Sequence, residues 1–165
     1  MDPTGTFRQM GLIAEGGAIS IVGCVRLLAG SSADSTLILI SLSLHNRGFT
    51  FRRDGDGFVA DYRVELVFRQ GNDIAQQVAR DERVRVGSFR ETLRTEESII
   101  FQQFVPVRIG DYVINVTVRD RGGPNVARSE VTAHIPGLEP PAVSHPIAVY
   151  EAHPRTSTGV PPTLV

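Results

Sequence analysis

The sequence predicts an all-β protein, an antiparallel β-sandwich with an extended arm before it and a Pro-rich tail after it. Apolar and polar residues alternate over several segments, and this period of two is that of a half-buried strand. Short Gly- and Asp-rich turns such as HNRG, DGDG and QGND separate the segments, and no long amphipathic helix interrupts them. Short strands in succession favour a sandwich over a parallel sheet.

The chain of 165 residues is long enough for one domain with appendages. Residues 1–17 are the expected arm, because their glycines allow no more than a short helical turn. Residues 18–136 are the expected sandwich. Residues 137–165 are the expected linker and tail, rich in Pro, in which the stretch AVSHPIAVYEA could add one edge strand.

Alternation and turn signals together define the strands of the sandwich. A long exposed loop, from Gly87 to Glu97, separates the fifth strand from the sixth. We expect strands near residues 18–29, 35–44, 48–53, 58–69, 74–86, 98–107, 111–120 and 126–135.

The stretch RRDGDGFVADYRVELVFRQGND tests whether a metal site interrupts this pattern. Asp54, Asp56 and Glu65 have the spacing of acidic residues in an EF-hand calcium loop. The template also needs an oxygen ligand at its fifth position and Gly at its sixth, where this chain has Phe58 and Val59. Strict alternation after the DGDG sequence places Glu65 on the solvent face of a strand. We therefore predict a hairpin tip at DGDG and no calcium site.

The most regular strand is GDYVINVTVRD, which is expected to pair with residues 126–135. Its inward side chains are Tyr112, Ile114, Val116 and Val118, and its outward ones Asn115, Thr117 and Arg119. A tyrosine near the start of a late strand is typical of immunoglobulin-like sandwiches, where its hydroxyl ties the corner. The fold we expect is therefore an immunoglobulin-like sandwich.

Composition limits the classes of function. The net charge is −1 and all 17 basic residues are Arg, so there is no general attraction to nucleic acid or anionic membrane. Cys24 is the only cysteine and lies in the apolar run AISIVGCVRLL, which favours a small buried side chain over a nucleophile. No apolar run approaches the roughly 20 residues of a membrane span. The start, MDP, does not resemble a signal peptide.

Motifs for catalysis, metals or nucleic acid are weak. No pair among the four histidines (His45, His134, His145 and His153) has the spacing of metal ligands. The chain has no G-x-S-x-G sequence and no Gly-rich phosphate loop that opens a helix. Arginines between residues 52 and 69 alternate with Asp and Glu, which indicates a solvated sheet face and not a nucleic-acid stripe. We expect no enzyme, cofactor or metal.

Three segments resemble the N-terminal β-sandwich of bacterial GWxTD-domain proteins. They are NRGFTFRRDGDGFVADYRVELVFRQG, VRVGSFRETLRTEESIIFQQFVPV and GDYVINVTVRD, and the exit segment PIAVYEAHPRTS extends the resemblance over roughly residues 10–157. The Gly-Trp-x-Thr-Asp element itself is missing, because the chain has no Trp. The resemblance implies an envelope-associated protein with an immunoglobulin-like domain, and it transfers no catalytic residue.

Taken together, these features lead us to expect a non-catalytic structural or adaptor subunit of a larger bacterial assembly, with protein partners and no nucleic acid. Its expected place is the periplasm or a membrane surface, the cytoplasmic face included. One concrete version, suggested only by lineages that carry the family, is a membrane-extrinsic subunit of a photosynthetic reaction centre–light-harvesting complex. The residues proposed to bind a partner are Phe7, Arg8, Met10, Phe89, Arg90, Tyr150, His153 and Arg155.

Two other functions stay open at this point. A ligand-binding sandwich for carbohydrate or peptide would use the loop at residues 87–97, and an exposed cluster of Tyr or Phe would favour it. A hydrolase would need, at minimum, a His within hydrogen-bond reach of a Ser or a carboxylate in a cleft.

Overall fold

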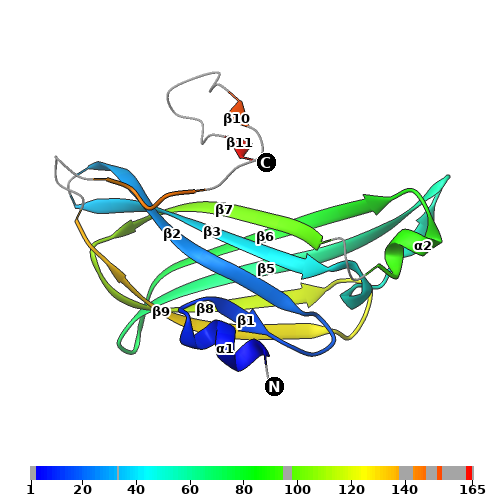
Figure 1. The fold of residues 1–165 in the computed structure, drawn as a ribbon, viewed down its shortest axis with the longest axis horizontal. Helices are drawn as coiled ribbons and strands as arrows, with labels where there is room; N and C mark the ends of the chain where they lie inside the picture. Colours follow the sequence, from blue (N-terminus) through cyan, green and yellow to red (C-terminus); the bar gives the residue numbers. More distant parts are fainter. Residues whose placement is uncertain are drawn as a thin grey trace.

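The computed structural model describes residues 3–32, 34–94, 98–137, 143–147, 152–153 and 163–164. Most of these residues belong to two antiparallel sheets that pack face to face (Figure 1), so the predicted all-β sandwich is confirmed. The immunoglobulin-like part of the expectation stays a prediction.

Sheet A is built around a long apolar strand, β3, which pairs with β2 on one side and β7 on the other. The strand order is β1-β2-β3-β7. Its strands are β1 (Ile13–Glu15), β2 (Ile21–Ser32), β3 (Ser35–His45) and β7 (Ser98–Arg108).

Sheet B is built around β5, which pairs with β6 along one edge and with β4 and β8 along the other. Strand β9 follows β8, so β6 and β9 are the two outer strands among the described ones. Its strands are β4 (Arg52–Asp54), β5 (Gly57–Gln70), β6 (Asp73–Val86), β8 (Gly110–Asp120) and β9 (Val126–Ile135).

The core lies between the sheets and is made by alternate residues of the central strands. In β8 the four side chains predicted to point inward are all buried, and in β5 the alternation from Ala60 to Phe68 is confirmed. The Phe68 and Tyr112 rings meet edge-on with centroids 6.4 Å apart, and Phe49 lies 5.1 Å from Tyr62. Burial raises the pKa of the Tyr62 hydroxyl to about 12.

The predicted strand at 48–53 is mostly wrong. Asn46–Gly48 form a 3-10 turn, η1, and only Arg52–Asp54 pair as β4. The turn packs tightly on the chain that enters β2, because a Cβ on Gly48 would lie 2.9 Å from the Ala18 carbonyl oxygen. A residue with a side chain does not fit there, and this close contact directs the chain from sheet A to sheet B.

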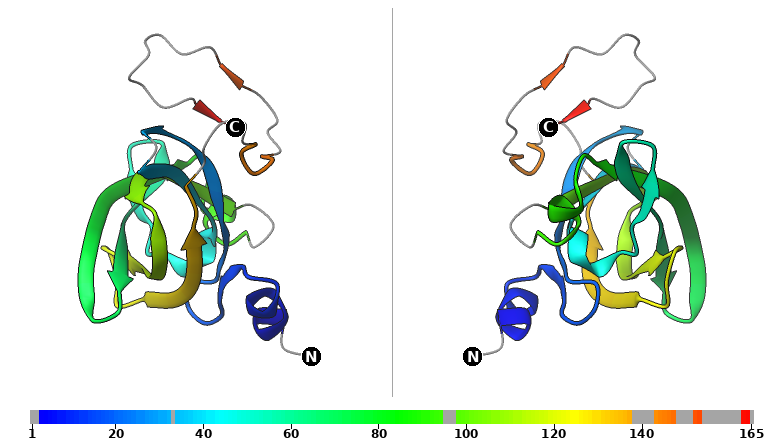
Figure 2. Two further views of the ribbon diagram at one scale, coloured as in Figure 1. Left: turned by 90° about the vertical axis from the view of Figure 1, so that its left-hand side faces the viewer. Right: turned by 90° about the vertical axis from the view of Figure 1, so that its right-hand side faces the viewer.

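The N-terminal arm carries more structure than the sequence predicts. Helix α1 (Pro3–Gln9) is followed by β1, which pairs with β2 and buries Ile13 and Ala14. The Ser129 hydroxyl on β9 donates a hydrogen bond to the Ala14 carbonyl oxygen at 3.2 Å. Residues 13–15 therefore belong to the sandwich edge, and α1 lies beside it (Figure 2).

Residues 143–147 run along the edge of β2 without forming a regular strand. The His145 backbone N–H donates to the Leu27 carbonyl at 2.8 Å, and the Ser144 hydroxyl oxygen accepts from the Ala29 N–H at 3.1 Å. The edge strand predicted over AVSHPIAVYEA is therefore not formed at residues 143–147, and residues 142 and 148–151 of that stretch lie outside the described residues. Beyond it, β10 (Ala152–His153) pairs with β11 (Thr163–Leu164).

Candidate functional site

The outer face of sheet A carries more apolar side chains than the solvated face of an antiparallel sheet normally does. The rows of opposite residues across β2, β3 and β7 are Val22–Ser43–Ile100, Cys24–Ser41–Gln102, Arg26–Leu39–Phe104 and Leu28–Leu37–Pro106. We call the apolar members of these rows the apolar face: Val22, Leu28, Leu37, Leu39, Ile100, Phe104 and Pro106.

Leu39 is the centre of the apolar face. It is only 2% exposed although it does not belong to the core between the sheets. Its neighbours in the register, Arg26 and Phe104, are both half-buried, whereas Ile100 near the β7 edge is 60% exposed. Solvated faces of antiparallel sheets normally carry polar side chains, so this face has the character of an interface.

Cys24 lies on the same outer face, opposite Ser41. It is a free thiol and is half-buried, so it is less buried than the sequence predicts. The reason is strand parity, because residues 21 and 27 point into the core while 22, 24, 26 and 28 point outward. The single cysteine of the chain is therefore a natural reporter for the apolar face.

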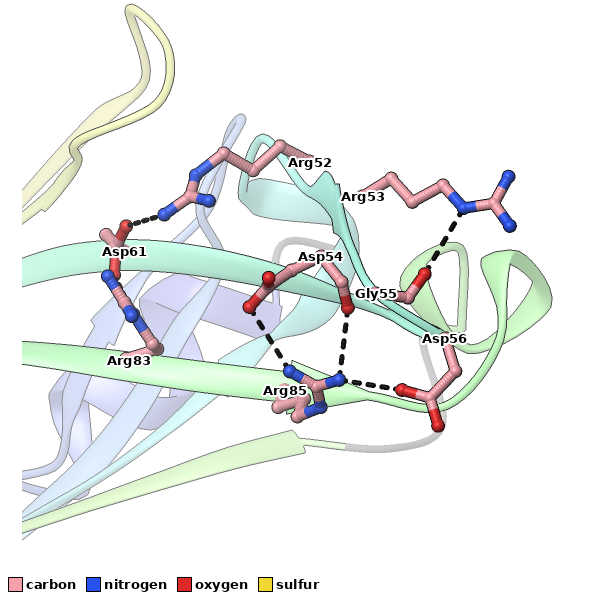
Figure 3. Close-up of polar contacts among 8 residues, drawn as sticks. All are labelled: Arg52, Arg53, Asp54, Gly55, Asp56, Asp61, Arg83 and Arg85. Atoms are coloured by element: carbon pink, nitrogen blue, oxygen red, sulfur yellow. Dashed lines mark hydrogen bonds and ion pairs between the residues drawn. The ribbon is translucent and has the colours of Figure 1, made fainter.

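The outer face of sheet B has the opposite character, since its charges pair with one another. Asp61 on β5 accepts from Arg83 at 2.5 Å and from Arg52 at 3.0 Å (Figure 3). Asp81 on β6 bonds Arg63 at 2.7 Å and Arg121 at 2.9 Å. The hydrogen bonds from Arg83 and Arg52 hold the pKa of the Asp61 carboxyl below its ordinary value.

The DGDG sequence is the hairpin tip that the sequence predicts. Gly55 has φ of +62°, and Asp54 and Asp56 both accept from the Arg85 guanidinium, at 3.2 and 2.8 Å (Figure 3). These carboxylates, which have calcium-loop spacing, are thus ion-paired with an arginine. The described residues contain no group of three or more His, Cys, Asp or Glu arranged to hold a metal ion.

The loop predicted at 87–97 contains a short helix, α2 (Phe89–Thr92). The Ser88 hydroxyl donates to the Glu91 carboxylate at 2.6 Å, and the same carboxylate accepts from the Gly87 N–H at 3.1 Å. Both hydrogen bonds lower the pKa of Glu91, and the one from Ser88 has the larger effect. Asn46 of η1 donates to the Glu91 carbonyl at 3.2 Å and so fixes the helix on the sandwich.

Helix α2 and the residue that caps its C-terminus present two apolar side chains at the end of the sandwich. Phe89 is 62% exposed and Leu93 is 61% exposed, four residues apart. The Phe89 ring lies 5.8 Å from the half-buried ring of Phe58. We call Phe89, Arg90 and Leu93 the α2 tip, and its fixed backbone makes it a second candidate contact surface.

The structure does not gather the residues proposed for partner binding into one site. Phe89 and Arg90 lie on α2, and Phe7, Arg8 and Met10 lie on or just after α1, at a different part of the sandwich (Figure 1). Tyr150 and Arg155 lie outside the described residues, and of His153 only the backbone, in β10, is described.

Around α1, the contacts are mainly structural. Arg8 donates from Nε to the Ala14 carbonyl at 2.8 Å and from Nη2 to Glu15 at 2.6 Å. Phe7 is half-buried, and its carbonyl accepts from the Leu12 N–H at 3.1 Å. Met10 is exposed but has no exposed apolar neighbour comparable to the pair on α2.

One histidine meets the minimum geometry set for a hydrolase. His134 Nδ1 lies 2.7 Å from Asp111 Oδ1, directly across the β8–β9 register. Both side chains are largely exposed, and none of their recorded hydrogen bonds involves a Ser or Cys in the described part of the chain. A general base needs a nucleophile within reach, so this arrangement is a hydrogen bond on the surface and not a catalytic pair.

The apolar face was missed by reasoning from alternation, although a signal for it was present. The run TLILISLSL is nearly continuous in apolar residues, which indicates a strand covered on both faces. The α2 helix also had a signal, since Ser88 and Glu91 have the spacing of a capping box.

Comparison of the chain with family models, with curated proteins and with solved structures finds no match. No helix in the described ranges has the length and apolar character needed to cross a membrane.

Proposed function

We propose that the protein is a non-catalytic structural or adaptor subunit that docks on a larger assembly through the apolar face of sheet A. The observation that carries this proposal is the outer face itself: Leu39 is buried without belonging to the core, and Ile100, two rows away on the same face, is 60% exposed. Apolar patches of this kind on soluble domains mark interaction sites.

The expected partner surface is apolar and carries little charge. Arg26 is the charged side chain in the middle of the apolar face, and its place opposite Leu39 makes it a site for one hydrogen-bonded contact to a partner carbonyl or carboxylate. The α2 tip would add a second contact at the end of the sandwich, with the Phe89 ring as its anchor.

The resemblance to the GWxTD-associated sandwich supports a bacterial envelope setting for this assembly. One concrete version of the proposal is a membrane-extrinsic subunit of a photosynthetic reaction centre–light-harvesting complex. The strand orders β2-β3-β7 and β6-β5-β8-β9 support the related proposal that the sandwich is immunoglobulin-like.

The reactivity of Cys24 tests directly whether a partner covers the apolar face. Maleimide labelling of the wild type is compared between purified protein and gently isolated native membranes. We expect labelling to be slower in membranes by on the order of tenfold, because a partner excludes solvent from the interface centre. A matched control carries C24S with Thr117→Cys, which moves the thiol to the outer face of sheet B. Equal rates for Cys24 in both preparations would contradict docking on sheet A.

Native purification then identifies the partner. Wild type, Ile100→Asp and Ile74→Asp are each isolated from the source membrane, and co-migrating proteins are identified by mass spectrometry. Ile74 on β6 is 54% exposed and is the matched control on the charged sheet. The proposal requires stoichiometric co-migration with wild type and I74D and its loss with I100D. A free monomer in the wild-type preparation would remove the subunit function.

Ligand binding at the α2 tip is the second candidate function. It rests on the exposed Phe89 ring beside Phe58, within the loop expected to bind carbohydrate or peptide. Tyr62 and Tyr112 are buried, so among the described aromatic residues it is Phe89 that offers an exposed ring for stacking. Retention on immobilised polysaccharide that Phe89→Ala abolishes would favour this function.

A further inference from the structure

A hollow on sheet B contains arginines that the ion-pair network of that sheet does not use. It has a volume of about 560 Å³ and is formed across β5, β8 and β9, with Arg8 of α1 at its border. Its cationic residues are Arg8, Arg69 and Arg128, and we call it the arginine hollow. Its size is that of a site for a small molecule.

Arg69 is the most unusual of the three arginines. Its side chain is half-buried, and its Nε atom is buried with no hydrogen-bond partner among the described residues. A buried donor without an acceptor costs stability, and native proteins seldom leave one unless an ion, water or ligand supplies the acceptor. The neighbouring arginines on the same sheet, Arg63 and Arg83, each have a carboxylate.

Arg128 lines the same hollow from β9, and its side chain likewise has no hydrogen bond or ion pair within the described ranges. Arg8 is held in place by Ala14 and Glu15 through Nε and Nη2, which leaves Nη1 free to donate. Cations therefore border the hollow from three different elements, and two of them lack a counterion.

The floor between the arginines is small and polar enough to complete such a site. Asn115 and Thr117 of β8 line it together with Val67 of β5. Glu130 is the one carboxylate in the lining, and it accepts from Asn115 Nδ2 at 2.8 Å. Its negative charge would repel an anionic ligand, so removing that charge should strengthen binding of an anion.

From these observations we infer that the arginine hollow binds a small oxyanion, a molecule bearing carboxylate or phosphate groups. Guanidinium groups form strong, paired hydrogen bonds with both kinds of group. The site lies on the sheet opposite the apolar face, so it is independent of docking and its failure would leave the proposed function untouched.

The test titrates ¹⁵N-labelled protein with citrate and, separately, with inorganic phosphate at constant ionic strength. The readouts are the Nε–H resonance of Arg69 and the backbone amide resonances of Asn115 and Thr117, which remain available in every variant. We expect a saturable shift with at least one probe, and the stronger of the two identifies carboxylate or phosphate as the preferred group. No saturable shift with either probe would overturn the inference.

Variants separate a built site from general attraction to positive charge. We expect Arg69→Gln and Arg128→Gln each to weaken binding by on the order of tenfold, because each removes a charged hydrogen bond. Arg119→Gln is the matched control, an exposed arginine on β8 outside the hollow, and it should leave affinity within about twofold. Glu130→Gln should tighten binding. If R119Q weakened binding as much as R69Q and R128Q do, or if E130Q weakened it, the site would be contradicted. Arg128 is exposed, and circular dichroism of R128Q checks that this variant keeps the fold.

Discussion

The two outer faces of the sandwich differ although both are built from alternating strands. On sheet B the outward side chains of β5 and β6 are charged, and Asp61 and Asp81 each bond two arginines. On sheet A the outward side chains include Leu37, Leu39 and Phe104. Sheet B thus pairs Asp61 and Asp81 with arginines and leaves Arg69 and Arg128 without a counterion among the described residues, whereas sheet A carries apolar side chains on its outer face. Burial of apolar area stabilises an interface more than burial of paired charges does, so the proposed partner would gain most on sheet A.

The largest expected losses of stability come from truncating a core side chain of β5, Phe68, and an outward side chain of β3, Leu39. Phe68→Ala removes a fully buried ring from the core and should lower the free energy of unfolding by about 3–5 kcal/mol. Leu39→Ala should cost about 2 kcal/mol, near the low end for leucine, because the outer face can rehydrate. Both are measured by urea unfolding. A cost for L39A below that of an ordinary surface change would show that the apolar face is not packed as described.

Asp61→Asn sharpens the comparison from the side of sheet B. It removes the carboxylate that Arg83 and Arg52 share, and we expect a loss of about 1 kcal/mol, since the pairs are partly exposed. The folded pKa of Asp61 lies below its unfolded value, so this stabilisation is present above about pH 4 and disappears as pH falls through the folded pKa.

The measurement for Asp61 is the difference in unfolding free energy between wild type and D61N at several pH values. The difference should be constant near neutrality and shrink in acid. It should also shrink with added salt, because the charges are near the surface. A difference that grows as pH falls would contradict the assignment of the two arginine bonds.

Strict alternation made sheet B predictable from sequence. Residues 58–69 and 111–120 have one apolar parity, and the structure extends them only to 57–70 and 110–120. The 126–135 strand was predicted with its full bounds. Each of these strands has one solvent-exposed face, so the alternation in its sequence predicts which side chains are buried.

Sheet A was harder because β3 is apolar on both parities. A continuous run predicts a strand but does not say what covers its second face. The 3-10 turn at Asn46–Gly48 was missed for another reason: it depends on contact with Ala18 and on a bond from Asn46 to Glu91, which are far apart in sequence. Local patterns do not contain such contacts.

The arginine hollow depends on three-dimensional placement in the same way. Arg8, Arg69 and Arg128 come from three separate elements, and nothing in their spacing brings them together. Arg69 belongs to the run of arginines that alternate with acids, and for Arg63 the expectation of paired charge fits the structure. Arg69 differs because the residues opposite it in the register are Val113 and Ile74, which offer no carboxylate.

Ser88→Ala tests whether the α2 tip is held rigidly enough to serve as a contact. Loss of the hydroxyl removes one bond to the Glu91 carboxylate and the cap on the Glu91 N–H, for an expected cost of about 0.5–1 kcal/mol. The effect should be local, so hydrogen exchange at residues 89–93 should quicken more than exchange in β5. Uniform quickening across the sandwich would show that the cap supports global stability instead.

The smallest expected change in stability separates packing from docking. Leu37→Ser and Val67→Ser each remove apolar area from a half-buried outward position, on sheets A and B respectively, and both should change the unfolding free energy by roughly 0.5–1 kcal/mol. Binding should distinguish them, because Leu37 lies in the apolar face and Val67 lies in the arginine hollow. Co-migration with the membrane assembly should weaken for L37S and persist for V67S. If both variants co-migrate like wild type, the apolar face is packed for stability alone, and the α2 tip becomes the surface on which docking would have to rest.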